Sequence, residues 1–204
     1  MKKIVIFASG SGSNAENIIK YFEGNRKIRV VALFCNRPDA FALERARRLG
    51  VPGIVFDREE LTSADGVSAR LRVLGADLIV LAGFLWRMPA IILEEYPGRV
   101  INIHPALLPA HGGKGMYGER VHEAVIRAGD KKSGITIHHV NEQYDEGAII
   151  FQTSCDVEPG ETPGSLATKI HALEHAHFPA VIRVLLERQH GTTRNNTPYN
   201  KYTT

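Results

Sequence analysis

Short apolar runs alternate with helical patterns along most of the chain, and this alternation constrains the fold more than any other feature. Seven runs rich in β-branched and aromatic residues predict strands, at 3–8, 29–34, 53–56, 78–82, 100–103, 134–140 and 148–153. Segments between most of them have helical periodicity, at 13–23, 41–49, 69–74, 89–96 and 119–128. Continuously apolar strands separated by helices indicate a mostly parallel seven-stranded sheet covered on both faces, that is, a doubly wound α/β fold.

The end of the chain predicts one long helix and a tail. The segment 163–189 carries an apolar stripe through Leu166, Ile170, Leu173, Phe178, Val181 and Leu185. Residues 190–204 are polar and lack periodicity. We therefore expect one domain over 1–189, which suits the length of 204 residues, followed by a tail over 190–204.

Composition narrows the possible partners and the compartment. A formal charge of +3 is too small to indicate a nucleic-acid-binding face and suits a small anionic substrate equally well. No run approaches the length of a membrane span, and the start at Met1 leads into a strand-like run rather than a signal peptide. Cys35 and Cys155 lie far apart in strand-like runs, which favours buried reduced thiols. We expect a mature cytoplasmic protein, a monomer or homodimer, that binds neither nucleic acid nor membrane.

A glycine-rich turn follows the first predicted strand, and its sequence is Ser9-Gly10-Ser11-Gly12-Ser13-Asn14-Ala15-Glu16. It matches the dinucleotide pattern G-x-G-x-x-A. The second strand nevertheless ends in Cys35-Asn36-Arg37, without the acid that would hold a ribose; Arg37 leaves NADP as an alternative. The turn's N–H groups and the hydroxyls of Ser11 and Ser13 instead predict a site for one phosphate monoester at a helix N-terminus. The same residues also fit a simple capping box, with Ser13 bonded to Glu16.

The strand near residue 100 ends in Asn102-Ile103-His104-Pro105. Side chains two positions apart on a strand share a face, so the amide and the imidazole can reach one substrate atom together. The alternative is a capped strand end with a satisfied histidine. Asp145-Glu146-Gly147 follows a later strand, and we expect its loop to emerge at the same sheet edge, where a carboxylate could face the imidazole; simple turn chemistry is the alternative.

Four motifs together resemble one family. They are the Ser-Gly-Ser-Gly-Ser-Asn turn, Leu81-Ala82-Gly83-Phe84, Asn102-x-His104-Pro105-x-Leu107-Leu108-Pro109 and Asp145-x-Gly147. Their order and spacing over about residues 3–186 resemble the glycinamide ribonucleotide formyltransferases. The resemblance implies a formyltransferase fold with a Rossmann-like N-terminal half. It implies transfer of a formyl group from the co-substrate 10-formyltetrahydrofolate to the amine of glycinamide ribonucleotide, in purine biosynthesis.

The resemblance also implies roles for individual residues. Asn102, His104 and Asp145 match the catalytic set: the amide and a protonated imidazole would stabilise the developing oxyanion, while the carboxylate would assist proton transfer. Asp145 would raise the pKa of His104. Beside Ser11, the residues that would hold the substrate are Gly12, Ser13 and Asn14 at the phosphate and Glu174 at the ribose and amine. The residues alone favour an exposed helix carboxylate for Glu174.

The residues expected to bind the folate are also implied by this resemblance. Leu85, Trp86, Arg87 and Met88, with the loop 141–145 and Asn102, would form the pteridine wall, and Arg58 would face the glutamate tail. No metal is required. The glycines of the segment 110–118 permit a mobile lid over the site, and an ordinary surface loop is the alternative.

Two other functions compete with this interpretation. His171-Ala172-Leu173-Glu174-His175 matches the zinc hydrolase motif H-x-x-E-H, although a catalytic zinc needs a third protein ligand. A non-catalytic nucleotide-binding module is the other, but it would not require Asn102, His104 and Asp145 together. Other formyltransferases of this fold, acting on methionyl-tRNA or hydrolysing formyl-folate, carry an additional domain that 204 residues do not accommodate.

Overall fold

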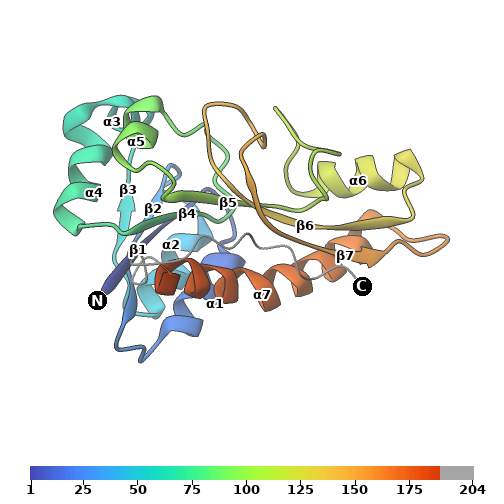
Figure 1. Ribbon diagram of the computed structural model, residues 1–204, viewed down its shortest axis with the longest axis horizontal. Coiled ribbons are helices and arrows are strands. Elements are labelled where there is room, and N and C mark those ends of the chain that lie inside the picture. Colours follow the sequence, from blue (N-terminus) through green and yellow to red (C-terminus); the bar gives the residue numbers. More distant parts are fainter. Residues whose placement is uncertain (189–204) are drawn as a thin grey trace.

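The computed structural model describes residues 1–188, which form a seven-stranded sheet with helices packed against it (Figure 1). The strands lie in the order β3-β2-β1-β4-β5-β6-β7. Their bounds are β1 (Lys2–Ala8), β2 (Ile28–Cys35), β3 (Gly53–Val55), β4 (Leu78–Leu81), β5 (Val100–His104), β6 (Lys132–His139) and β7 (Ile149–Asp156). Strands β1 to β5 run parallel to one another, and β6 is antiparallel to both of its neighbours, β5 and β7. The expected mostly parallel α/β fold is confirmed; the tail expected over 190–204 lies outside the described residues.

Helices cover both faces of this sheet. They are α1 (Ser13–Phe22), α2 (Phe41–Arg48), α3 (Arg58–Thr62), α4 (Ala69–Leu74), α5 (Ala90–Glu95), α6 (Glu119–Ala128) and α7 (Pro163–Arg188), with a short irregular helical segment over Ala64–Ser68. Residues of α1, α2 and α7 join one apolar cluster, and residues of α4 and α5 join another. Strand β1 supplies both clusters, Ile4 and Ile6 to one and Val5 and Phe7 to the other. All four are fully buried, which explains why this strand reads as a continuous apolar run.

The long helix α7 buries a different stripe from the expected one. Leu166, Ile170 and Phe178 are buried as expected, but Ile182 and Leu186 complete the row. Leu173, Val181 and Leu185, which were also expected on the stripe, are only partly buried. The buried positions recur every four residues, so Glu174 falls on the same row.

The alternative of a capping box at the first helix is excluded. Gly12 is the N-cap of α1 and no side chain caps this helix, while Glu16 pairs with Lys20 and Arg45 instead. A capping box does form at α3, where the Asp57 carboxylate accepts from the Glu60 N–H at 2.8 Å and Glu60 accepts from the Asp57 N–H at 3.1 Å. The aspartate in D-x-x-E therefore caps a helix here, whereas the serine of S-x-x-E does not.

The strand order reverses between β1 and β4. From β1 the chain continues through β2 and β3 toward one edge of the sheet, and through β4 and β5 toward the other. The connections after β1 and β4 therefore diverge at the carboxyl ends of the strands and leave a crevice between them. The two connections meet at its base, where the Ser9 N–H donates to the Gly83 carbonyl at 3.0 Å.

Candidate active site

A cleft of about 360 Å³ lies at this reversal of strand order, within the size range of small-ligand sites. Its walls come from the turn after β1, the segment after β4, the end of β5, the segment 113–118 and the loop between β6 and β7. All the residues predicted for catalysis and for binding the nucleotide substrate line it: Ser11, Gly12, Ser13, Asn14, Asn102, His104, Asp145 and Glu174. The structure therefore brings together residues that are up to 163 positions apart in sequence, from Ser11 to Glu174.

The glycine turn presents the N-terminus of α1 to the cleft. Gly12 has φ 74°, which side-chain-bearing residues rarely adopt, and a Cβ there would lie 2.6 Å from Cα and Cβ of Ala42. Arg45 holds the turn by donating to the Ser11 carbonyl at 2.9 Å. Because no side chain caps α1, its first N–H groups stay available to an anion. In a dinucleotide site an acidic residue at the end of the second strand holds the ribose. Here Asn36 stands at that position, and its side-chain oxygen accepts from the Ser9 hydroxyl at 2.6 Å.

Glu174 is buried in the cleft wall rather than exposed, so the favoured expectation from the residues alone is wrong. Its side chain accepts a hydrogen bond from the Asn14 amide at 2.8 Å. Burial raises the pKa of Glu174, against the opposing effects of Asn14 and His171. The Oδ1 atom of Asn14 is buried without a partner, which leaves one acceptor beside the turn for a ligand.

Asn102 and His104 share one face at the end of β5, as their spacing predicts. The antiparallel neighbour β6 places His138 opposite Asn102 and Thr136 opposite His104. His104 is 2% exposed, and its Nε2 lies 2.8 Å from the His111 carbonyl. A carbonyl can only accept, so Nε2 carries a proton and Nδ1 is the nitrogen that titrates.

Asp145 reaches these two residues by a different route from the expected one. Because β6 is antiparallel to β5, its end lies beside Val100, at the beginning of β5, where the Val140 N–H donates to the Val100 carbonyl at 2.9 Å. The loop then folds over the sheet, as the arch between β6 and β7 in Figure 1 shows. At Gly147 a Cβ would lie 1.6 Å from the His139 carbonyl, so only glycine permits this return.

The Asp145 carboxylate faces several groups at once. Its Oδ2 accepts from the Gly113 N–H at 2.9 Å and lies 3.5 Å from Nδ1 of His104. Its Oδ1 lies 3.5 Å from Nδ2 of Asn102 and 3.6 Å from Nε2 of His138. Asp145 also has φ 58°, an uncommon backbone conformation for a residue other than glycine.

The pKa values show how burial and charge compete here. Burial lowers the pKa of His104, while the Asp145 charge and the His111 carbonyl act in the opposite direction. Asp145 therefore acts on the His104 pKa in the expected direction, but desolvation of the imidazolium outweighs this pairing and the net pKa is lowered. Burial acts to raise the pKa of Asp145, but His138, His104 and the Gly113 N–H hold this pKa below its ordinary value. The pair thus favours an ionised carboxylate beside a neutral imidazole.

Two histidines of the cleft were not predicted from the sequence. His138 donates from Nδ1 to the His139 carbonyl at 2.8 Å, so in its neutral form Nε2 accepts from the Asn102 amide at 3.1 Å. His122, on α6, is 2% exposed and its Nδ1 has no hydrogen-bond partner. No motif of the sequence marks either histidine, and only strand register and helix packing show that they face the site.

The expected folate wall forms the other side of the cleft. Leu85, Trp86 and Met88 line it, and Trp86 packs edge-on against Phe56 and Phe84, with ring centroids 6.2 and 6.4 Å apart. Arg58 does not reach this cleft. Its guanidinium lies over the Trp86 ring, 4.5 Å from the centroid, and it lines an adjoining hollow together with Lys114 and Tyr144.

The segment 110–118 borders both the cleft and the hollow. Gly113, Gly115 and Gly118 have positive φ values of 98°, 88° and 56°, so glycine is suited to each of these positions. Gly113, Gly115, Met116, Tyr117 and Gly118 line the cleft. This placement over the site is consistent with the expected lid; motion of the segment stays a prediction.

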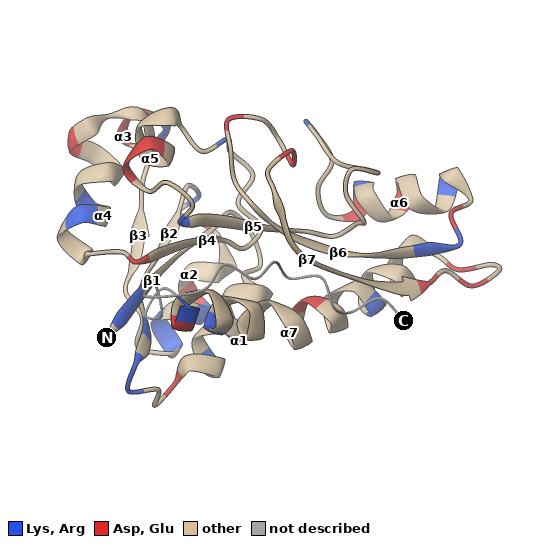
Figure 2. Ribbon diagram, in the orientation of Figure 1, with Lys and Arg blue, Asp and Glu red and all other residues tan. Residues whose placement is uncertain are grey.

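Other features bear on the competing functions. Within residues 1–188, no cluster of three or more histidine, cysteine, aspartate or glutamate side chains is arranged to bind a metal ion, so the zinc hydrolase alternative gains no support. No helix in that part of the chain is long and apolar enough to cross a bilayer. Lys and Arg are spread over several elements and interspersed with Asp and Glu (Figure 2).

Comparison with known proteins identifies the family. Residues 2–182 match the family described as formyl transferase. Phosphoribosylglycinamide formyltransferase of Bacillus subtilis is 37% identical, covering 91% of this chain and 95% of that protein. The chloroplastic phosphoribosylglycinamide formyltransferase of Arabidopsis thaliana is 40% identical and covers 92% of this chain, which spans 66% of that protein.

Solved structures agree with these relatives. Glycinamide ribonucleotide transformylase 1 from Symbiobacterium toebii has a TM-score of 0.83 and 36% identity, covering 92% of this chain and 89% of that one. Phosphoribosylglycinamide formyltransferase from Bacillus halodurans has a TM-score of 0.83 and 36% identity, covering 95% of this chain and all of that one. The resemblance inferred from the motifs is confirmed, and the chain belongs to the formyl transferase family, in which it groups with the phosphoribosylglycinamide formyltransferases.

Proposed function

We propose that this chain is an enzyme that transfers the formyl group of 10-formyltetrahydrofolate to the primary amine of glycinamide ribonucleotide, in purine biosynthesis. The products are formylglycinamide ribonucleotide and tetrahydrofolate. The observation that carries the proposal is the position of the Asp145 carboxylate, with Asn102, His104 and His138 at 3.5–3.6 Å in one cleft. Hydrogen bonds at full strength are shorter, about 2.7–3.2 Å, so the Asn102 amide can make a stronger contact to the oxygen of the reacting formyl group, and His104 can do so once its Nδ1 is protonated.

The reaction requires one bond to form, one bond to break and one proton to move. The substrate amine attacks the formyl carbon, and negative charge develops on the formyl oxygen. The Asn102 amide donates to that oxygen, and its position at the end of a strand fixes the donor before reaction. The bond from the carbon to N10 of the folate then breaks, and N10 takes the proton that the amine loses.

His104 and Asp145 carry this proton in the proposed mechanism. Because Nε2 of His104 already donates to the His111 carbonyl, the proton enters at Nδ1, which faces Asp145. The imidazolium formed there is stabilised by the carboxylate and can donate to the oxyanion in turn. His104 therefore gains its charge during the reaction, in keeping with its lowered pKa in the ligand-free protein.

The two substrates occupy opposite sides of the cleft. We assign the phosphate of the nucleotide to the uncapped start of α1, with Ser11, Gly12, Ser13 and Asn14 around it. Glu174 lies beside Asn14 and is assigned to the ribose and amine. The folate ring lies against Leu85, Trp86 and Met88 with Asn102 at its reactive end, and Arg58 in the adjoining hollow faces its acidic tail.

The whole of 1–189 serves as one catalytic unit in this proposal, because the β1 turn and the β6–β7 loop border the same cleft. Cys35 and Cys155 are both unpaired, which suits the reducing cytoplasm.

An assay with the purified chain and both substrates tests substrate identity and reaction together. We expect formyl transfer, measured from the appearance of tetrahydrofolate, without added metal and without loss of rate after incubation with a chelator. Absence of turnover from a protein with native circular dichroism would overturn the proposal. Loss of activity on chelation, restored by zinc, would favour the hydrolase alternative.

The non-catalytic alternative is tested by the same preparation. Calorimetric titration of Asp145→Asn with each substrate should give affinities near those of the unmodified chain, although turnover is lost. A binding module would show the same affinities in both proteins and no turnover in either.

A further inference from the structure

One short segment holds both proposed proton carriers. The His111 carbonyl accepts from Nε2 of His104 at 2.8 Å, and the Gly113 N–H donates to Oδ2 of Asp145 at 2.9 Å. Between them, Gly112 is packed so closely that a Cβ would lie 2.5 Å from Cδ2 of Leu108 and 3.3 Å from Cβ of Asp145. A displacement of the segment 111–113 would therefore move both contacts together.

The His111 side chain anchors this segment on the side away from the cleft. Its Nε2 lies 2.6 Å from Oδ2 of Asp130, which follows the end of α6. The two side chains are 18% and 38% exposed, so the contact is partly shielded from water. His111 has φ 54°, an unfavourable conformation that persists only where surrounding contacts impose it.

The chemistry does not itself require a histidine at this position. Any residue would supply the carbonyl that His104 uses, and the imidazole of His111 is directed to Asp130 rather than to His104. The His111 side chain therefore contributes by holding its own backbone in place.

We propose that His111 and Asp130 form a positioning pair for the reaction, which fixes the segment 111–113 and through it the orientation of His104 and Asp145. This inference rests on the proposed function for its effect on rate. Its effect on His104 is independent of the substrate, because donation to the carbonyl favours the charged imidazole and its loss lowers the His104 pKa further.

Matched substitutions separate this role from general stability. His111→Leu and Asp130→Ala each remove the hydrogen bond between the two side chains. His111→Gln is the matched control for His111→Leu. Glutamine must adopt the same backbone conformation at position 111, but it keeps an N–H donor for Asp130. Glu161→Gln is the control for general stability. It breaks the ion pair between Glu161 and Lys169, at 2.7 Å, which lies outside the cleft.

We expect His111→Leu and Asp130→Ala to lower kcat about tenfold, since small misplacement of reacting groups costs up to about 10²-fold. The KM for each substrate should stay within about twofold, because neither residue is assigned to substrate binding. His111→Gln should retain kcat within about threefold, and Glu161→Gln should match the unmodified chain.

An NMR titration of His104 in the absence of substrates gives the deciding measurement. The His104 pKa should fall in His111→Leu and Asp130→Ala and stay unchanged in Glu161→Gln. An unchanged His104 pKa in the first two variants, with a lowered melting temperature alone, would overturn the positioning role. If the unmodified chain failed to transfer formyl groups while the His104 pKa still fell, the positioning of His104 would stand and the substrate assignment would be wrong.

Discussion

The side chain of Asn14 donates to the buried carboxylate of Glu174 at 2.8 Å, joining the start of the first helix to the middle of the last. Glu174 occupies a row of α7 whose other members are apolar, and it is 5% exposed. A charged carboxylate is costly at such a position unless it is paired or hydrogen-bonded, and the Asn14 amide supplies one such hydrogen bond. The contact therefore joins a residue that we propose to bind the phosphate to one that we propose to bind the ribose and amine.

Glu174→Gln should stabilise the fold and weaken nucleotide binding. Burial raises the pKa of Glu174 in the folded chain, so the folded state holds the proton more strongly than the unfolded state. Stability conferred by this group is complete below the unfolded pKa and is lost as the pH rises through the folded pKa. Glutamine keeps an acceptor for Asn14 and carries no charge to desolvate.

Thermal unfolding at several pH values tests this prediction. At pH 7.5 we expect the variant to melt higher by about 2 °C or more, corresponding to roughly 1 kcal/mol in a chain of this size. The difference should shrink toward pH 4. A variant that melts lower at neutral pH, or equal nucleotide affinity in both proteins, would contradict the assignment.

Gly12→Ala should destabilise the chain, whereas Gly10→Ala should not. At position 12 the methyl group meets Ala42 at 2.6 Å and the backbone has φ 74°, while a Cβ at Gly10 meets nothing within 4 Å. We expect a loss of about 2–4 kcal/mol for Gly12→Ala. For Gly10→Ala the change should stay within about 0.5 kcal/mol.

Urea unfolding of the two variants provides the comparison, since both add one methyl group to the same turn. Equal destabilisation would show that the close approach to Ala42 does not limit residue 12. Because Gly12 has this structural role, phosphate binding is better tested at Ser13, whose side chain lines the cleft.

The strand pattern was predictable from the sequence because strands buried on both faces consist of continuous apolar runs. All seven strands were expected, with ends displaced by a few residues; β6, for example, is Lys132–His139 where 134–140 was expected. Strand direction was not predictable in the same way, because apolar runs do not distinguish parallel from antiparallel neighbours. The path of the Asp145 loop and the approach of His138 to Asn102 depend on that direction.

Glu174 and the helix caps show two other limits. The spacing of Leu166, Ile170 and Phe178 along α7 already placed Glu174 on the buried row, but general burial habits of glutamate favoured an exposed side chain. The S-x-x-E pattern at Ser13 predicted a cap, yet the left-handed Gly12 begins the helix there. Local motifs identify candidates, and tertiary contacts decide among them.

Asp145→Asn should abolish most turnover while leaving the site folded. Asparagine tolerates the φ of 58° at this position and can still accept from the Gly113 N–H. The substitution removes the negative charge that favours a proton on His104, so we expect kcat to fall by about 10²-fold or more, with smaller changes in ligand affinity. The His104 pKa should fall further, because the Asp145 charge acts to raise it.

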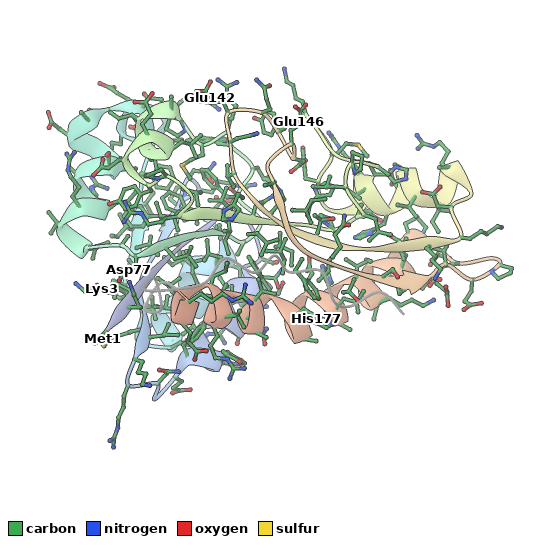
Figure 3. All side chains as sticks on the ribbon, in the orientation of Figure 1. Met1, Lys3, Asp77, Glu142, Glu146 and His177 are labelled. Carbon is green, nitrogen blue, oxygen red and sulfur yellow. The ribbon has the colours of Figure 1, made fainter. Side chains whose placement is uncertain are left out.

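Glu146→Gln is the matched control, since it removes one charge from the adjacent residue of the same loop. Figure 3 shows Glu142 and Glu146 on the arch between β6 and β7, and both are exposed, whereas Asp145 is partly buried. Turnover and the His104 titration should match the unmodified chain in this control. If Asp145→Asn instead retained near-normal turnover and an unchanged His104 titration, the proposed proton pair would be wrong, and Glu142 or Glu146 would become the candidate carboxylate.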